Sequence, residues 1–236
     1  MTNPKTAIIT GAGRGIGRAT AIQLSAGGAS CVLIARSNNE LAETASLCAG
    51  ETLVISCDVR DPARIGAAVE QAIARFGRID VLVNNAGYAP LLPFDQTTPT
   101  IWDDVIAINL SAVYHFCRAV WPGMVARKSG VIVNVSSEAS RDPFPGFSAY
   151  ATAKAAVNMF TRSLAKEGDA HGIRLHAIAP AGVETSMLRA IASEQVLPRD
   201  HTLDPADVAA AICACVTGDL RHASGETIFI HRRTGP

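Results

Sequence analysis

Short apolar runs rich in β-branched residues recur along the chain, and longer amphipathic stretches separate them. The runs are apolar at nearly every position instead of alternating, which is typical of parallel strands covered on both faces. We predict strands over Thr6–Thr10, Ser30–Ala35, Thr52–Cys57, Ile79–Asn84, Gly130–Ser136, Ile173–Ala179 and Glu226–Ile230. We predict helices over Gly15–Gly27, Asn38–Ala49, Pro62–Phe76, Ile101–Arg127, Ser148–Ala170 and Pro205–Thr217.

This alternation predicts an α/β fold: a Rossmann-type, doubly wound sheet of seven mainly parallel strands with helices on both faces. No Pro/Gly/Ser-rich linker, charge block or internal repeat divides the chain, so we expect one domain over residues 1–236. The least regular long connection, Glu184–Asp204, is a candidate lid over a binding site.

Composition narrows the class of partner. Lys plus Arg and Asp plus Glu each number 21, and this balance gives no electrostatic attraction for nucleic acid or an anionic membrane. No apolar run approaches the ~20 residues that span a bilayer. The start of the chain also lacks the pattern of a secretory signal. We therefore expect a small-molecule partner, no nucleic acid and no membrane.

Six cysteines lie scattered through apolar segments: Cys31, Cys48, Cys57, Cys117, Cys213 and Cys215. Cys213 and Cys215 form a C-x-C pair, but no second pair follows at metal-ligand spacing, so no metal site is predicted. Reduced, buried thiols that pack as small apolar groups are expected, and they fit a cytoplasmic location.

The first predicted strand leads directly into a glycine-rich loop, Thr10–Gly17, and a helix follows. Glycines let the backbone turn sharply and approach a pyrophosphate, whose charge then lies at the helix N-terminus. Ile16 stands where the G-x-G-x-x-G pattern would need its last glycine. Because the loop opens the first βα unit of the sheet, it predicts a dinucleotide site.

The end of the second strand bears on the choice of dinucleotide. An NAD site needs an acidic residue here for the ribose 2′-hydroxyl, but no carboxylate precedes Glu40. Arg36 instead offers a planar, permanently charged group for a 2′-phosphate, and Arg14 in the loop offers a second cation. NADP(H) is therefore preferred, with NAD(H) as the alternative.

A second group of polar residues follows the later strands. Tyr150 and Lys154 are spaced to share one face of a helix. Ser136 and Ser137 end one strand, and the turn at 84–87, Asn-Asn-Ala-Gly, ends another, at the sheet edge where ligands bind. Each feature alone has a purely structural explanation.

Together with the T-G-x-x-x-G-x-G loop, these residues make the chain resemble the short-chain dehydrogenase/reductase family over nearly its whole length. Its general layout is most similar to that of the 3-oxoacyl-thioester reductases. The resemblance implies the catalytic residues Asn109, Ser137, Tyr150 and Lys154. It implies cofactor contacts from Gly11, Gly13, Arg14, Gly15, Ile16, Gly17, Arg36, Asp58, Val59, Asn85, Ala86, Gly87, Tyr150, Lys154, Pro180, Gly182, Val183 and Thr185. The family spacing between serine and tyrosine selects Ser137 over Ser136.

The implied reaction explains these residue types. Hydride transfer to a carbonyl leaves an alkoxide, which needs a proton donor such as Tyr150. A lysine ammonium ~6 Å away, at an effective dielectric near 20, would favour the tyrosinate by about 3 kcal/mol and lower the pKa of Tyr150 by roughly two units. Ser137 would hydrogen-bond the substrate oxygen. The resemblance implies that Asn109 holds a water linking Lys154 to solvent.

Two departures from the family pattern stand near the end of the chain. Ala181 replaces the usual glycine after Pro180, while the threonine at Thr185 keeps its place. The ending at 231–233, His-Arg-Arg, replaces the usual Asp-Gly-Gly. We expect a solvated terminus there; the alternatives are salt bridges across a subunit interface and attraction of an anionic substrate tail. The family forms dimers and tetramers, so a homo-oligomer is expected, and the altered ending leaves open which one.

Substrate choice is expected to depend on three flanking segments, Tyr88–Phe94, Glu138–Phe147 and Glu184–Asp204. The middle one carries two phenylalanines and one arginine, which suits an apolar carbonyl compound, including one with an anionic group. We expect an NADP(H)-preferring oxidoreductase acting on a carbonyl or secondary alcohol. The alternatives are an NAD-dependent alcohol dehydrogenase of the same family and a catalytically silent, cofactor-binding regulator.

Overall fold

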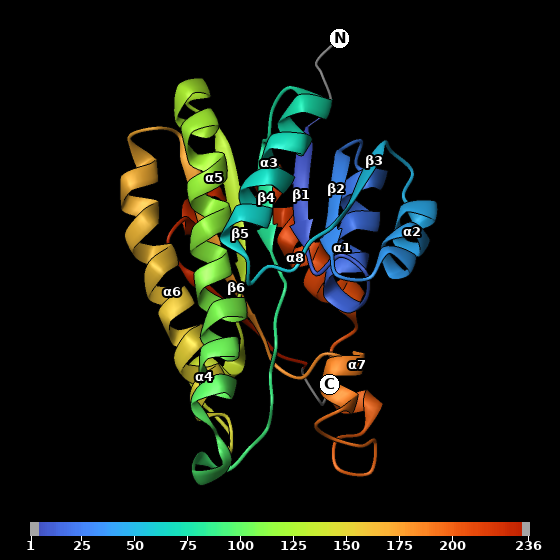
Figure 1. Cartoon of the computed structure of the whole chain (residues 1–236), viewed down its shortest axis with the longest axis vertical. Helices are drawn as coiled ribbons and strands as arrows, with labels where there is room; N and C mark the ends of the chain where they lie inside the picture. The colour runs from blue at the N-terminus through green and yellow to red at the C-terminus, as the bar shows by residue number, and fades with distance from the viewer. Residues whose placement is uncertain (1–4, 233–236) are drawn as a thin grey trace.

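The computed structural model describes residues 5–232, in which seven strands form one sheet in the order β3-β2-β1-β4-β5-β6-β7 (Figure 1). The strands are β1 (Thr6–Thr10), β2 (Ser30–Ala35), β3 (Thr52–Ser56), β4 (Val81–Asn84), β5 (Gly130–Val135), β6 (Ile173–Pro180) and β7 (Thr227–Ile230). All neighbouring strands are parallel. The predicted fold class is confirmed.

Helices cover both faces of this sheet (Figure 1). The α-helices are α1 (Gly15–Ala26), α2 (Asn38–Leu47), α3 (Pro62–Phe76), α4 (Pro99–Ile106), α5 (Ala112–Arg127), α6 (Ser148–Asp169), α7 (Ser186–Arg189) and α8 (Pro205–Thr217). Helices α3, α5 and α6 share one apolar core with the sheet, and α1, α2 and α8 share the other. No helix within residues 5–232 is long and apolar enough to cross a bilayer.

The side chains of each strand alternate between the two cores. Ile8 of β1 points into one core and Ile9 into the other, and both are fully buried. Burying such a side chain stabilises the fold by about 1.5–3 kcal/mol. Because both faces are covered, every position of a central strand must be apolar, and this explains the continuous apolar runs in the sequence.

Most predicted elements match the observed ones to within one or two residues, but the predicted helix Ile101–Arg127 does not. The helix begins earlier, at Pro99, because the Thr98 hydroxyl accepts a hydrogen bond from the Ile101 amide and caps it. A π-helical segment, Ala107–Ser111, then separates α4 from α5. Such segments often lie at functional sites, and this one contains Asn109.

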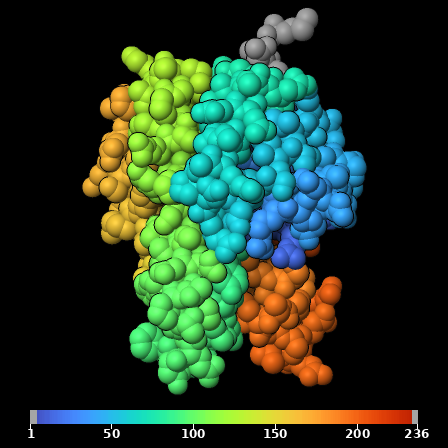
Figure 2. Space-filling view, in the orientation of Figure 1, coloured from blue at the N-terminus to red at the C-terminus, as the bar shows by residue number. Residues whose placement is uncertain are grey.

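The strand order places a crevice beside β1. Its neighbours β2 and β4 lead into helices on opposite faces, so their connections diverge at the carboxyl ends of the strands. Figure 2 shows the molecule hollowed between the green lobe around residues 88–110 and the orange lobe around residues 184–204. The predicted site residues lie on the strand ends and segments that border this hollow.

All six cysteines are free thiols. Four of them are buried, as predicted, whereas Cys48 and Cys213 are only half-buried. Burial raises the pKa of Cys31, Cys117 and Cys215 to about 12, because the thiolate loses its hydration. These thiols pack as apolar groups.

Candidate active site

The glycine loop needs glycine for two separate reasons. Gly11 and Gly15 adopt positive φ angles of 65° and 54°, a backbone region that side chains disfavour. Gly17 has an ordinary backbone, but a Cβ there would lie 2.2 Å from the Gly11 carbonyl oxygen. Helix α1 therefore packs directly on the loop, and no side chain caps its first turn. Its free N–H groups and the cradle left by the glycines fit a pyrophosphate.

Arg18 holds the shape of the loop, a role that the sequence does not reveal. Its guanidinium donates to the Gly13 carbonyl oxygen at 2.6 Å and pairs with Glu43 of α2 at 2.8 Å. Thr44 of α2 donates to the Ala12 carbonyl oxygen at 3.0 Å. Helix α2 thus fixes the outer side of the loop through the loop's own carbonyl groups.

Thr10 joins the glycine loop to the turn after β4. Its hydroxyl accepts hydrogen bonds from the Asn85 and Ala86 amides, both at 2.9 Å. The Asn85 side chain returns a hydrogen bond to the Thr10 carbonyl oxygen at 2.9 Å. The predicted cofactor residues of these two strands therefore form one rigid unit.

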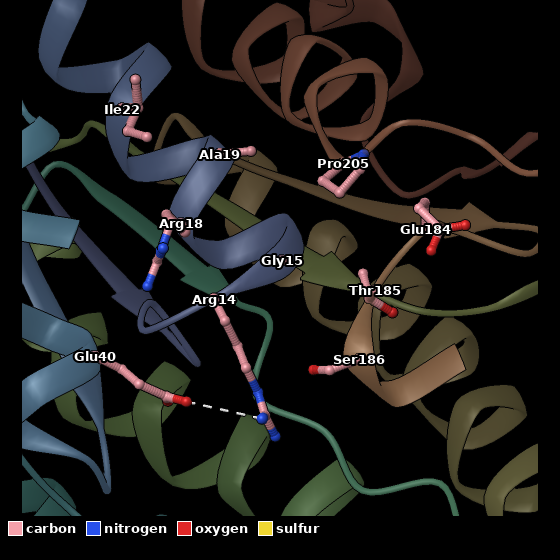
Figure 3. A pocket seen from close by; sticks show the side chains of 10 residues that line it. All are labelled: Arg14, Gly15, Arg18, Ala19, Ile22, Glu40, Glu184, Thr185, Ser186 and Pro205. Carbon is pink, nitrogen blue, oxygen red and sulfur yellow. Dashed lines mark ion pairs between the residues drawn. The ribbon is translucent and has the colours of Figure 1, made fainter. Parts of the chain in front are cut away.

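A pocket of about 600 Å³ opens beside the loop between α1, α7 and the start of α8 (Figure 3). Its lining residues are Arg14, Gly15, Arg18, Ala19, Ile22, Glu40, Glu184, Thr185, Ser186 and Pro205. Arg14 and Glu40 face each other across its mouth, with 3.8 Å between nitrogen and oxygen. Glu40, on α2, therefore brings a carboxylate to the glycine loop opposite Arg14, a pairing that the sequence does not reveal.

The two predicted residues of the adenine side differ in their surroundings. Arg36 is exposed at the end of β2, and no ion pair engages it within residues 5–232. Asp58 follows β3 and accepts hydrogen bonds from Arg60, which lower the pKa of its carboxyl group to about 2. Val59 beside it is buried.

Tyr150, Lys154 and Ser137 meet at the carboxyl end of β5. The Lys154 ammonium donates to the Val135 carbonyl oxygen at 2.8 Å and lies 5.6 Å from the Tyr150 ring centroid. Ser137 accepts from the Ala139 amide at 3.2 Å and forms a hydrogen bond with Tyr150. The structure thus brings together three of the four predicted catalytic side chains.

The pKa values of this pair correct one expectation. Instead of falling under the influence of Lys154, the pKa of Tyr150 is raised to about 12 by burial, and the hydrogen bond with Ser137 opposes this only in part. Burial also lowers the pKa of Lys154 to about 8. Loss of hydration outweighs the lysine's attraction in the protein alone, so the tyrosine stays protonated at neutral pH.

Asn109, the fourth predicted catalytic residue, is fully buried in the π-helical segment. Its side-chain amide donates to the carbonyl oxygens of Tyr88, at 2.7 Å, and Val105, at 2.9 Å. It also accepts from the Tyr88 amide at 3.3 Å. These bonds tie the segment after β4 to α4, and the water-holding role of Asn109 stays a prediction.

A buried polar chain holds the catalytic helix against the sheet. Asn84 of β4 donates to Asn134 of β5, Asn134 donates to Thr161 of α6, and both distances are 2.8 Å. Thr161 in turn donates to the Val157 carbonyl oxygen. The Asn134 amide is bonded through both its oxygen and its nitrogen, whereas Asn84 Oδ1 has no partner within residues 5–232. The chain of bonds through Asn134 defines one docking position for the helix.

The segment after β6 folds back on itself. Leu203 pairs with the backbone of Gly182, and Val183 and Leu203 form an isolated parallel bridge. Thr185 caps α7 by accepting from the Leu188 amide at 3.2 Å, and its methyl group packs near Gly15. The candidate lid, Glu184–Asp204, is therefore tied to the sheet by both of its ends, beside the glycine loop.

His231 and Arg232 after β7 are exposed to solvent, as expected, but they also contact two of the segments that flank the site. His231 lies 3.5 Å from the Glu138 carboxylate, and Arg232 donates to the Thr202 carbonyl oxygen at 2.9 Å. Arg233 lies outside the described residues. Residues 5–232 contain no group of three His, Cys, Asp or Glu side chains placed to bind a metal ion.

Comparison with known proteins agrees with this geometry. Residues 5–196 match the family model described as short chain dehydrogenase. The chain belongs to the short-chain dehydrogenase family. It is 32% identical over 233 residues to the 3-oxoacyl-(acyl-carrier-protein) reductase FabG of Escherichia coli, with 96% of each chain covered. It is 35% identical to the NADPH carbonyl reductase 2 of Sus scrofa, with 95% of this chain and 93% of the relative covered.

The crystal structure of a levodione reductase superposes with a TM-score of 0.89 at 29% identity, covering 96% of both chains. The family resemblance predicted from the sequence motifs is therefore confirmed. The protein is an oxidoreductase that acts on CH–OH or C=O groups with NAD(P).

Proposed function

We propose that the protein is an NADP(H)-preferring carbonyl reductase in which Tyr150 donates the proton. The observation that carries this proposal is the position of the half-buried Tyr150, held beside Ser137 and the Lys154 ammonium at the carboxyl end of β5. The cofactor site and the substrate site belong to one domain over residues 1–236. A cytoplasmic homo-oligomer, dimeric or tetrameric, fits the family.

Three side chains have separate roles at the substrate oxygen: Ser137, Tyr150 and Lys154. Ser137 Oγ accepts from the Ala139 amide, and its O–H, which hydrogen-bonds Tyr150 in the free protein, would turn to donate to the developing alkoxide when substrate binds. Tyr150 Oη transfers its proton to that oxygen, and Lys154 stabilises the tyrosinate that remains. The Lys154 ammonium donates one hydrogen bond to the Val135 carbonyl oxygen, and its other N–H groups are available to the cofactor. The bound nicotinamide cofactor supplies or accepts the hydride.

The glycine loop and its neighbours would hold that cofactor. The pyrophosphate fits the uncapped first turn of α1, where a Cβ at Gly17 would intrude. The exposed guanidinium of Arg36, with Arg14 across the pocket mouth, supports a 2′-phosphate. The name of the related carbonyl reductase, which includes NADPH, supports the same preference.

Tyr150→Phe tests the proton donor. We expect turnover of a panel of ketones with NADPH to fall by about a thousandfold, within the range of general acid catalysis. The affinity for NADPH, measured by fluorescence titration, should stay unchanged. Tyr114→Phe, on the exposed face of α5, is the matched control and should behave as wild type. Near wild-type turnover by Tyr150→Phe would show that another group donates the proton.

Arg36→Ala tests the cofactor preference separately. We expect the NADPH affinity to fall about tenfold while the NADH affinity stays constant, since only NADPH carries the 2′-phosphate. Arg118→Ala on α5 serves as the control for loss of a surface charge. Tighter binding of NADH than of NADPH by the wild type would refute the preference.

One observation favours a second candidate, an NAD-dependent alcohol dehydrogenase. Glu40 lies against the loop: a Cβ on Gly13 would be 2.9 Å from its carboxylate oxygen. A carboxylate in this place could accept hydrogen bonds from a ribose diol and would repel a 2′-phosphate. The fluorescence titrations with both cofactors decide between the two candidates.

A further inference from the structure

The three segments that flank the catalytic groups converge in space. Leu92 donates from its amide to the Gly146 carbonyl oxygen at 3.0 Å, so the segment after β4 pairs with the one after β5. The Met187 methyl group lies 3.8 Å from the position of a Cβ on Gly87. This contact joins the segment after β6 to the segment after β4, and Figure 2 shows the hollow between the lobes that contain these two segments.

Large apolar side chains are exposed on all three flanks. Six of those exposed in residues 5–232 lie there: Tyr88, Leu91, Phe94, Phe144, Met187 and Val196. Phe144 is 71% exposed, although it sits beside the site and not on an outer helix. Apolar surface gathered around a cleft marks a place where an apolar ligand docks.

A series of aromatic rings leads from Phe144 to the proton donor. The Phe144 and Phe147 ring centroids lie 6.2 Å apart, and those of Phe147 and Tyr150 lie 5.4 Å apart. Phe147 is buried and fixes the spacing, so Phe144 presents the exposed end of the series. Rings at these distances pair favourably in tilted or offset arrangements, and a ligand ring can continue the series.

Each arginine in the three flanking segments already forms an ion pair with a carboxylate. Arg141 pairs with Glu138 at 2.7 Å, and its guanidinium lies 4.0 Å from the Phe229 ring centroid. Arg189 pairs with Glu184, and Arg199 pairs with Glu194 at 2.7 Å. The sequence suggested that Arg141 could receive an anionic group on the substrate. Each of these arginines is instead already matched by a carboxylate, so an anion would have to displace one.

Resting on the proposed function, we infer that the preferred substrate is a neutral ketone with a ring next to the carbonyl group, and that Phe144 is the surface on which that ring docks. The aromatic series supplies the contact, and a carboxylated substrate would have to displace a carboxylate from Arg141, Arg189 or Arg199 to gain a counter-charge there. Linear ketones can reach the same proton donor but cannot stack on Phe144.

Matched ketones test this inference with the intact protein and NADPH. Acetophenone is compared with 2-octanone and 1-tetralone with 2-decanone, each pair having the same number of carbon atoms. 4-Acetylbenzoate adds a carboxylate to acetophenone. We expect kcat/KM to favour the ring ketone in each pair, and the carboxylate to lower it by about tenfold, since Arg141, Arg189 and Arg199 of the flanks are already paired with carboxylates.

Variants of Phe144 test whether this side chain causes the preference for ring ketones. Phe144→Ala should lower kcat/KM for the ring ketones by about three- to tenfold, mainly through KM, and leave the linear ketones unchanged. Phe144→Tyr should keep the preference, and Phe144→Leu should lose it because the ring is gone. Leu47→Ala removes an exposed apolar side chain at the end of α2 and is the control.

The outcomes separate this inference from the proposed function. Reduction of linear or carboxylated ketones as efficiently as ring ketones overturns the ring preference but leaves the reductase intact. An unchanged preference in folded Phe144→Ala overturns the role of Phe144. Failure of the cofactor-loaded protein to reduce any ketone of the panel overturns the proposed function itself.

Discussion

The two halves of the active site are built in opposite ways. On the cofactor side, the chain approaches itself so closely that a single added carbon on Gly17 would collide with a backbone oxygen. On the substrate side, side chains such as Phe94 and Phe144 stand exposed on irregular segments. Backbone contacts shape the first half, and side chains shape the second.

This difference shows which half can vary without loss of the fold. The glycine loop touches α1, α2 and the end of β4, so a change there disturbs several elements at once. The substrate flanks are held mainly by a few hydrogen bonds and exposed ion pairs, which contribute little to stability. Substitutions should therefore affect the cofactor half far more strongly than the substrate half.

Gly17→Ala should have the largest effect. Its Cβ would lie 2.2 Å from the Gly11 carbonyl oxygen and 2.6 Å from the Asn85 amide nitrogen, so the backbone must shift. We expect NADPH affinity to fall at least about a hundredfold and the fold to lose about 1–3 kcal/mol. Fluorescence titration and urea denaturation measure the two effects.

Gly66→Ala in α3 is the matched control. Nothing lies within 4 Å of a Cβ at that position, so the substitution should stabilise the protein by about 1 kcal/mol through helix propensity. Wild-type cofactor binding by Gly17→Ala would show that the loop is less constrained than its contacts indicate.

Lys154→Met tests the junction of the two halves. Burial lowers the pKa of Lys154 from 10.5 to about 8, so the folded protein releases this proton at lower pH than the unfolded chain. The free energy of unfolding of the wild type should therefore rise relative to that of the variant between about pH 8 and 10.5. At pH 7 the variant should be more stable in the absence of cofactor, by up to about 3 kcal/mol.

Urea denaturation at pH 7 and pH 10 measures this difference. Lys166→Met, on the exposed side of the same helix, makes the same substitution without removing a buried charge and is the control. If the free energies of unfolding of Lys154→Met and wild type differ by the same amount at both pH values, the buried amine does not titrate in this range.

Glu40→Gln should have a smaller effect, confined to the choice of cofactor. It removes the partner of Arg14 in an exposed ion pair (Figure 3). Since exposed pairs contribute about 0.2–1 kcal/mol, we expect NADPH affinity to rise about two- to fivefold with NADH affinity unchanged. If NADH affinity falls instead, Glu40 is a ribose ligand and the second candidate function gains support.

His231→Ala should have the smallest effect and belongs to the substrate half. Arg141 still holds Glu138 after the imidazole is removed, so the turn after Ser137 keeps its main ion pair. We expect the KM for ketones to rise about twofold, as for one weak exposed pair, with cofactor affinity unchanged. His222→Ala, exposed near the start of β7, is the control. A larger change in cofactor affinity than in KM would contradict the division into two halves.

The sequence predicted the sheet and the glycine-lined turn after β1 well because both depend on local backbone requirements. A strand covered on two faces must be apolar throughout, as Ile8 and Ile9 show, and a close backbone approach needs glycine, as at Gly17. Such requirements leave a signal within a few consecutive residues. The order in which the elements alternate then predicts the topology.

Contacts between distant segments leave no comparable signal. Glu40 opposite Arg14, and Arg18 on the Gly13 carbonyl, are charged helix residues that look like ordinary surface positions in the sequence. The sequence-based prediction that the pKa of Tyr150 falls was wrong, because it took account of the nearby lysine but not of the burial of both groups. Burial is a property of the packed molecule and cannot be obtained from spacing.

The contacts of His231 and Arg232 also bear on the order in which the protein is made. They attach the chain after β7 to two of the three flanking segments, at Glu138 in one and at Thr202 in the other. The residues that make these contacts are synthesised after β1 and the glycine loop. Since folding during synthesis proceeds from the N-terminus, a nascent chain can form its cofactor cradle before its substrate flanks are joined.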